Sequence, residues 1–441
     1  MTVDRKLGIW MCAALVVGNM IGAGIFLLPA SLAPYGMNSV FAWVATSAGA
    51  ILLACVFAGL SRAFPDAAGP YEYVRMAFGE MAAFVVAWGY WVSIWVGNAA
   101  LVTGTVSYLG AIFPVLHGNV PLNALISLGA VWVMTAVNIR GVRTAGAVQV
   151  VTTVLKLMPL FAICLLGIFL FFRQDPRIAW HATDAVPVSA GGITAAASLT
   201  LWALLGFESA SVAAQRVQDP QRTIPRATVI GCVAVAVIYI LSCTTVILLS
   251  TSAELAKSGA PFADVASRFW GSGAGEAVAI FAAISGFGCL NGWILLHGEV
   301  PMQMARNRVL PAVFAKLSRW QTPAIGLCVS STLVSALVLM NYGKSLVELF
   351  TFLILLSTTA TLVLYLACAL ATLWLLHRRR IAVQGPQAAL LAVAAVLGSL
   401  YALWTFYGAG KEALFWGLVL MVASVPVYFL MKRGAAVEAT A

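Results

Sequence analysis

Two ionisable side chains lie deep inside long apolar runs of the sequence. Lys156 falls well within the run 147–172, and Glu208 is in the middle of the run 191–215. Charged groups are costly inside a bilayer and usually serve function there, so both are candidates for gating or proton coupling. Two plainer alternatives stay open: a structural carboxylate at Glu208, and a lysine that extends to the membrane surface at position 156.

Glycines interrupt two of the apolar runs. Residues 18–24 contain three glycines, and Gly206 stands close to Glu208. Glycine weakens a helix and lets the backbone unwind, although small residues also allow close helix packing in membranes. Corresponding breaks in two halves of a chain indicate a transport site between inverted repeats. The freed N–H groups would hold a carboxylate and the freed C=O groups an ammonium, as an α-amino acid requires.

The composition indicates that these runs lie in a bilayer. Of the 441 residues, 62% are apolar and 9% are charged, whereas soluble proteins have about 45–50% and about 25%. A soluble enzyme, a disordered protein and a nucleic-acid-binding protein are therefore excluded. The net charge of +10 is spread over short connectors. The eight cysteines and four histidines show no metal-binding spacing, so neither a cofactor nor a metal is expected.

A membrane helix needs about 20 mostly apolar residues. On that criterion the sequence predicts an all-α integral membrane protein of twelve transmembrane helices in a single domain, 1–441. The predicted spans are 9–33, 38–60, 81–113, 122–139, 147–172, 191–215, 226–250, 276–300, 323–341, 346–376, 388–408 and 412–431. The predicted loops on the side of the termini hold 18 of the 25 Lys and Arg residues. This bias predicts cytoplasmic N and C termini in a bacterial inner membrane.

Several motifs carry a resemblance to a known family. They are GNMIGAGIFLLPA at 18–30, LWALLGFESASVAA at 201–214, Asp219-Pro220, Ile224-Pro225, and the pair Gly292-Trp293. The sequence resembles the amino acid/polyamine/organocation superfamily, and most closely its basic amino acid/polyamine antiporter branch, which includes arginine/agmatine antiporters. The resemblance implies a LeuT-like fold with two inverted five-helix repeats, here about 9–172 and 191–376, followed by two helices at 388–431. It also makes a homodimer possible.

The resemblance assigns roles to individual residues. Tyr90 and Tyr365 match positions that form a gate with the acid at the position of Glu208. In the family this acid has a role in gating and in pH response on the periplasmic side. Read alone, either tyrosine is typical of the membrane interface. The break residues expected to bind the amino-acid head group are Ile21, Gly22, Ala23, Gly24 and Leu205.

Two tryptophans and two polar residues match the positions that bind the rest of the substrate. In the family, the aromatic ring at Trp202 closes over the substrate and the ring at Trp293 stacks on its side chain. Asn98 and Ser357 match residues that hydrogen-bond the distal group of arginine or agmatine. Packing for the tryptophans and interhelical hydrogen bonds for the polar residues are the ordinary alternatives.

Some residues depart from the antiporter pattern. Ser93 and Ile94 replace two small residues, and Ala23 replaces a serine that would contact the carboxylate. The sequence around Lys156 resembles that of superfamily members that transport neutral or mixed amino acids. In those proteins a lysine ammonium takes the place of the sodium ion that sodium-driven relatives bind.

The sequence therefore predicts a sodium-independent amino-acid antiporter that exchanges a cationic, arginine-like substrate for a related amine or amino acid. A proton-coupled permease for neutral amino acids is the alternative. An enzyme would need a cluster of catalytic side chains at one membrane face, and His117, His181, His297 and His377 are scattered.

Overall fold

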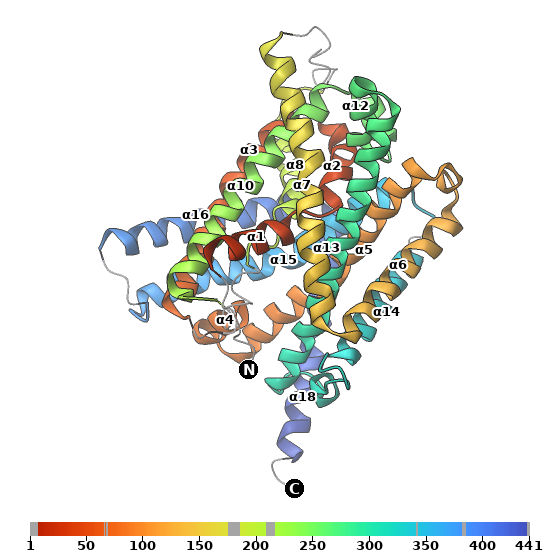
Figure 1. The fold of residues 1–441 in the computed structure, drawn as a ribbon. Helices are drawn as coiled ribbons and strands as arrows, with labels where there is room; N and C mark the ends of the chain where they lie inside the picture. Colours follow the sequence, from red (N-terminus) through yellow and green to blue (C-terminus); the bar gives the residue numbers. More distant parts are fainter. Residues whose placement is uncertain are drawn as a thin grey trace.

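The protein is a bundle of helices, seen in the computed structural model (Figure 1). The structure describes residues 8–65, 67, 69–174, 186–208, 217–340, 343–381 and 385–438. The helices are α1 (Ile9–Met20), α2 (Gly24–Leu32), α3 (Asn38–Ala63), α4 (Pro70–Phe78), α5 (Glu80–Ile112), α6 (Val120–Arg140), α7 (Val142–Phe172), α8 (Ala190–Ala203), α10 (Pro220–Leu248), α11 (Ser252–Lys257), α12 (Pro261–Trp270), α13 (Ser272–Arg306), α14 (Ala324–Met340), α15 (Leu346–His377), α16 (Pro386–Gly408), α17 (Lys411–Val422) and α18 (Ser424–Glu438). Three short 3-10 helices lie at Ala33–Tyr35, Pro114–Leu116 and Ala312–Ala315.

Many of these helices are long enough to cross a membrane. Within the described residues nine have the necessary length and apolar character, and the bent pair α1 and α2 makes a tenth. The apolar helices α8 and α14 are shorter. Each apolar stretch predicted from the sequence contains at least one of these helices. In the sixth stretch, α8 ends at Ala203 and residues 209–215 lie outside the described part of the chain.

Local sequence explains where several helices begin. At the start of α15, Ser345 Oγ accepts from the Glu348 N–H and the Glu348 carboxylate accepts from the Ser345 N–H, which pairs two donors that the first turn leaves free. Pro220 opens α10, where a missing N–H costs nothing. Gly79, with φ of 86°, separates α4 from α5. The short helices α4, α11 and α12 were not predicted, because hydropathy selects only long apolar runs.

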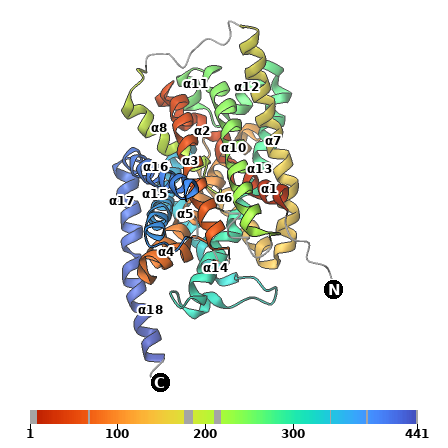
Figure 2. The same cartoon turned by 90° about the vertical axis from the view of Figure 1, so that its left-hand side faces the viewer.

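Helix α5 is the centre of the bundle. In its most apolar window 89% of the residues are buried, against 28% in α6 and 17% in the segment spanning α17 and α18. Helices α13 and α15 pack along α5 and complete the inner layer. Figure 2 shows α17 and α18 at the outer edge of the bundle. Their exposed apolar side chains are expected to face lipid, because lipid is the solvent for such surfaces.

Candidate functional site

The first predicted helix is broken in the structure. Helix α1 ends at Met20, α2 begins at Gly24, and their axes are bent by 45°. Ile21 is extended, with φ of −83° and ψ of 112°. The carbonyls of residues 18–21 are at the end of α1, where helical geometry provides no N–H partners. In the apolar interior these four acceptors need donors from elsewhere.

Lys156 supplies two of these donors. It is fully buried on α7, and its Nζ donates to the carbonyl of Gly18 and, at 2.6 Å, to the carbonyl of Ile21. The carboxyl end of a helix carries partial negative charge, so an ammonium is favoured there. Lys156 therefore acts inside the protein, and the structure does not place it at the membrane surface.

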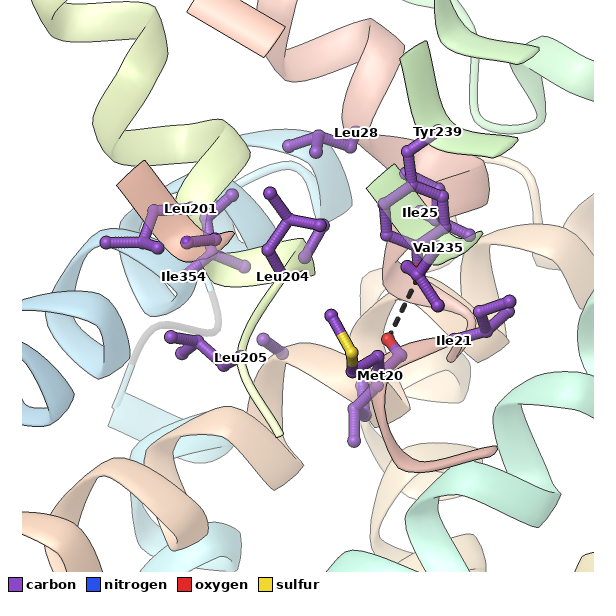
Figure 3. Packing of buried hydrophobic residues seen from close by; sticks show 14 of the residues in the cluster. Met20, Ile21, Ile25, Leu28, Leu201, Leu204, Leu205, Val235, Tyr239 and Ile354 are labelled. Carbon is purple, nitrogen blue, oxygen red and sulfur yellow. Dashed lines mark hydrogen bonds between the residues drawn. The ribbon is translucent and has the colours of Figure 1, made fainter. Parts of the chain in front are cut away.

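Two aromatic residues cap the remaining carbonyls. Trp293 Nε1, from α13, donates to Asn19 O at 3.2 Å. The Tyr239 hydroxyl, from α10, donates to Met20 O at 2.9 Å, as Figure 3 shows. All four carbonyls at the end of α1 are thus bound by side chains from three other helices. The break is therefore stabilised by hydrogen bonds from the surrounding helices.

The second break follows α8. The chain turns after Ala203, and Gly206 has φ of 108°, which side-chain-bearing residues rarely adopt. Glu208 comes two residues later and is 1% exposed. Residues 209–216 lie outside the described part of the chain.

The Glu208 carboxylate collects donors from three segments. Oε1 accepts from the Tyr90 hydroxyl of α5 at 3.1 Å, and Oε2 accepts from the Tyr365 hydroxyl of α15 at 2.7 Å. Oε2 also accepts from the Gly206 N–H at 3.2 Å. Phe207 stacks on the Tyr365 ring, with centroids 4.9 Å apart. Tyr90, Glu208 and Tyr365, which the resemblance groups together, are therefore in hydrogen-bond contact.

A cavity of about 510 Å³ lies between the two breaks. Ten of the predicted site residues line it: Gly22, Gly24, Tyr90, Ser93, Ile94, Trp202, Leu205, Glu208, Trp293 and Ser357. The other five, Ile21, Ala23, Asn98, Lys156 and Tyr365, do not line it. Ile21 and Lys156 lie behind it at the first break, and Tyr365 lies behind Glu208.

The two breaks are in direct contact. A Cβ on Gly24 would lie 2.0 Å from the Trp202 ring, so the indole packs against the glycine backbone. A Cβ on Gly206 would lie 3.4 Å from the carbonyl of Asn19 and 3.3 Å from the Trp293 ring. Both breaks and both predicted tryptophans therefore meet at one place.

The hydroxyl groups at the cavity are engaged with backbone. Ser357 Oγ donates to Ser93 O at 2.9 Å, and Ser93 Oγ donates to Tyr90 O at 2.7 Å. Each oxygen keeps lone pairs that can still accept from a bound molecule. The Ser357 bond links α15 to α5 along the cavity wall, and the Ser93 bond lies within α5.

Asn98 contacts a histidine on another helix. Its amide is fully buried, and Nδ2 lies 3.1 Å from Nδ1 of His297 on α13. His297 was not predicted to belong to the site. Tyr239 and the cavity-lining Cys289 were missed as well, because a phenol or a thiol in an apolar run carries no local signal of a partner.

Comparison with known proteins decides the family. A family model described as "Amino acid permease" matches residues 7–431. The chain belongs to this amino acid permease family. Within the described residues, no group of three or more His, Cys, Asp or Glu side chains could hold a metal ion.

Several curated relatives have assigned names. A Bacillus subtilis (strain 168) protein named "Putative arginine/ornithine antiporter" is 33% identical over 84% of each chain. The cadaverine/lysine antiporter of Escherichia coli (strain K12) is 32% identical over 77% of this chain and 76% of its own. The putrescine transporter PotE of Haemophilus influenzae is 29% identical over 96% of this chain and 97% of its own. This family membership confirms the resemblance seen in the motifs at both breaks.

Proposed function

We propose that this permease is a sodium-independent antiporter that exchanges a cationic amino acid for a related amine or amino acid by alternating access. The relatives are named for arginine, ornithine, lysine, cadaverine and putrescine. All of these molecules carry a basic group at the end of an aliphatic chain. The neutral amino-acid permease has no support of this kind, so the cationic substrate is preferred.

The single observation that carries the proposal is the contact of both helix breaks around one cavity. The free N–H groups at the start of α2, next to Gly22 and Gly24, suit a substrate carboxylate. Trp202 and Trp293 offer aromatic faces to a cation, worth about 2 kcal/mol when water is excluded. The proposed substrate-binding set remains Ile21, Gly22, Ala23, Gly24, Ser93, Ile94, Asn98, Trp202, Leu205, Trp293 and Ser357, with Tyr90, Glu208, Tyr365 and Lys156 as gating or proton-coupling residues.

Lys156 supports independence from sodium. Unwound carbonyls at a helix break are the ligands that sodium-driven carriers use. Here the carbonyls of Gly18 and Ile21 are bound by the Lys156 ammonium, which supplies the positive charge that a sodium ion would bring.

We extend the proposal to the architecture. Twelve transmembrane helices, in two inverted repeats of five followed by two more, form one domain in the bacterial inner membrane. Both termini are cytoplasmic, and the molecule acts alone or as a homodimer, without nucleic acid.

The gate belongs on the cytoplasmic side in this arrangement. Tyr90 lines the central cavity and also a second cavity of about 670 Å³, whose wall includes Glu72 of α4 and Asn307 after α13. That end of α13 joins a predicted cytoplasmic loop. Cytoplasmic termini thus require Tyr90 and Glu208 to close the inner path, opposite to the periplasmic side implied by the resemblance.

Exchange in liposomes tests the function. Purified protein is reconstituted without sodium, and uptake of labelled ornithine is measured with ornithine, arginine, putrescine, leucine or buffer inside. Uptake is expected only against an internal cationic substrate, and protein-free liposomes are the control. Uptake of labelled leucine along a proton gradient, without ornithine uptake, would overturn the proposal.

A further inference from the structure

Asn98 and His297 form a buried polar contact beside the central cavity. On α5, Ile94 and Leu101 line the cavity and lie four residues before and three residues after Asn98. On α13, Trp293 lines the cavity and lies four residues before His297. Residues three or four apart share a helix face, so both partners belong to the faces that form the cavity wall. Both are fully buried.

Two hydroxyl groups, those of Thr135 and Ser331, form a hydrogen-bonded chain next to His297, and the direction of their hydrogens can be worked out. Thr135 Oγ1 on α6 is 2.7 Å from the carbonyl of Val131 and 2.6 Å from Ser331 Oγ on α14. Two contacts this short each need a proton. A carbonyl only accepts, so the Thr135 proton goes to Val131. The Ser331 proton must then point to Thr135.

This direction determines the state of the imidazole. Ser331 Oγ lies 3.5 Å from His297 Nε2, a long contact, and has no proton left to offer it. Nε2 therefore carries the hydrogen and faces a lone pair of Ser331. In a neutral imidazole the other nitrogen is then a bare acceptor. Nδ1 accepts from Asn98 Nδ2, at 3.1 Å.

The Asn98 amide is left with one unpaired atom. With its NH₂ turned to His297, Oδ1 is buried and has no hydrogen-bond partner among the residues that the structure describes. An unsatisfied buried acceptor costs about 1–3 kcal/mol. Such an acceptor is free to pair with a ligand, and the neighbours of Asn98 on α5, Ile94, Gly97 and Leu101, line the central cavity.

We propose that His297 is a positioning residue that holds Asn98 Oδ1 ready to accept a hydrogen bond from the basic end of the substrate. Ammonium and guanidinium groups have donors and no acceptors, so only one orientation of the amide suits them. A freely rotating amide would present NH₂ part of the time. This inference rests on the proposed function, because it needs a substrate with a distal cation.

Matched ligands isolate the distal contact. Norvaline has the head group and carbon chain of ornithine without the terminal ammonium. Calorimetric binding of both ligands is measured on the purified full-length protein and its variants. His297→Leu is expected to weaken ornithine binding about tenfold, the value of one hydrogen bond to a charged group, and to leave norvaline binding unchanged. His377→Leu, at the exposed end of α15, is the control.

Two further variants separate positioning from packing. His297→Gln offers an acceptor oxygen to Asn98 and should restore ornithine binding to within about threefold. The double variant Asn98→Leu with His297→Leu should bind ornithine no more weakly than Asn98→Leu alone, because His297 acts only through Asn98.

The outcomes are distinct. If the wild type binds norvaline as tightly as ornithine, the proposed function fails. If the wild type prefers ornithine but His297→Leu binds ornithine as tightly as the wild type, the role of His297 fails. It also fails if the losses from Asn98→Leu and His297→Leu add in the double variant. If His297→Leu does not fold, Ser331→Ala replaces it, since it frees the imidazole to change tautomer. A selective loss of ornithine binding then supports the proposal, and unchanged binding overturns it.

Discussion

The two helix breaks that meet at the cavity are held in opposite ways. At the first break, side chains of α7, α10 and α13 donate hydrogen bonds to four backbone carbonyls. At the second break one acidic side chain, Glu208, collects donors from α5, from α15 and from its own turn. A cation therefore holds one break and a carboxylate holds the other.

The difference bears on which break can move. Opening the first requires several partners from three helices to separate together. Opening the second requires the loss of contacts to a single carboxylate. We therefore expect the first break to be the fixed side of the site and the second to be the moving side. Four substitutions test this comparison, beginning with the largest expected effect.

Lys156→Met should damage the first break most. It keeps the length of the side chain but removes the Lys156 hydrogen bonds to the carbonyls of Gly18 and Ile21, at about 1–3 kcal/mol for a buried acceptor that loses its donor. Thermal unfolding in detergent should shift to lower temperature, and exchange should be lost. Lys257→Met, on the exposed short helix α11, should behave as wild type. Equal stability of the two variants would show that the first break does not depend on this ammonium.

Tyr365→Phe should affect function more than the fold. It removes one donor from Glu208, and bonds to a charged acceptor are worth about 1.5–3 kcal/mol. A weakened gate should alter the rate of exchange in liposomes while the protein stays folded. An exchange rate equal to that of the wild type would remove the tyrosine from the gate.

Gly206→Ala should strain the second break. A side chain at φ of 108° costs about 1–2 kcal/mol, and its Cβ would press on the Trp293 ring. Slower exchange and a lower unfolding temperature are expected. Gly129→Ala is the control, because a Cβ there meets no atom of the described residues within 4 Å and alanine favours the helix. A loss of the same size in the control would make the effect unspecific.

Tyr239→Phe should have the smallest effect. It removes one neutral hydrogen bond, to Met20 O, worth about 1 kcal/mol, while Lys156 and Trp293 still hold the break. A small fall in unfolding temperature with unchanged exchange is expected. A complete loss of exchange would mean that the first break is not held by several independent partners.

Much of this site follows from the sequence. The glycines at 18–24 and the Gly206–Glu208 stretch predicted both breaks, because glycine weakens a helix and an acid is costly inside an apolar run. The resemblance then selected Trp202 and Trp293, which the structure brings to the cavity.

The rest depends on packing between distant helices. The resemblance selected Asn98, but could not show that His297 would lie against it. Tyr239 was missed for the same reason, since its partner is a backbone carbonyl 219 positions away. The sixth span was expected over 191–215 with a break at Gly206; α8 ends at Ala203, before that glycine, and residues 209–215 lie outside the described part of the chain.

The ammonium of Lys156 is bound to the end of α1 and stays with the protein. A charge that returns to its starting place in every cycle adds nothing to the net current. The current of the proposed exchange is then set by the substrates alone. Arginine against ornithine moves no net charge, whereas ornithine against putrescine moves one. A membrane potential of 100 mV biases one charge by about 2.3 kcal/mol, so the choice of partner decides whether membrane voltage drives this carrier.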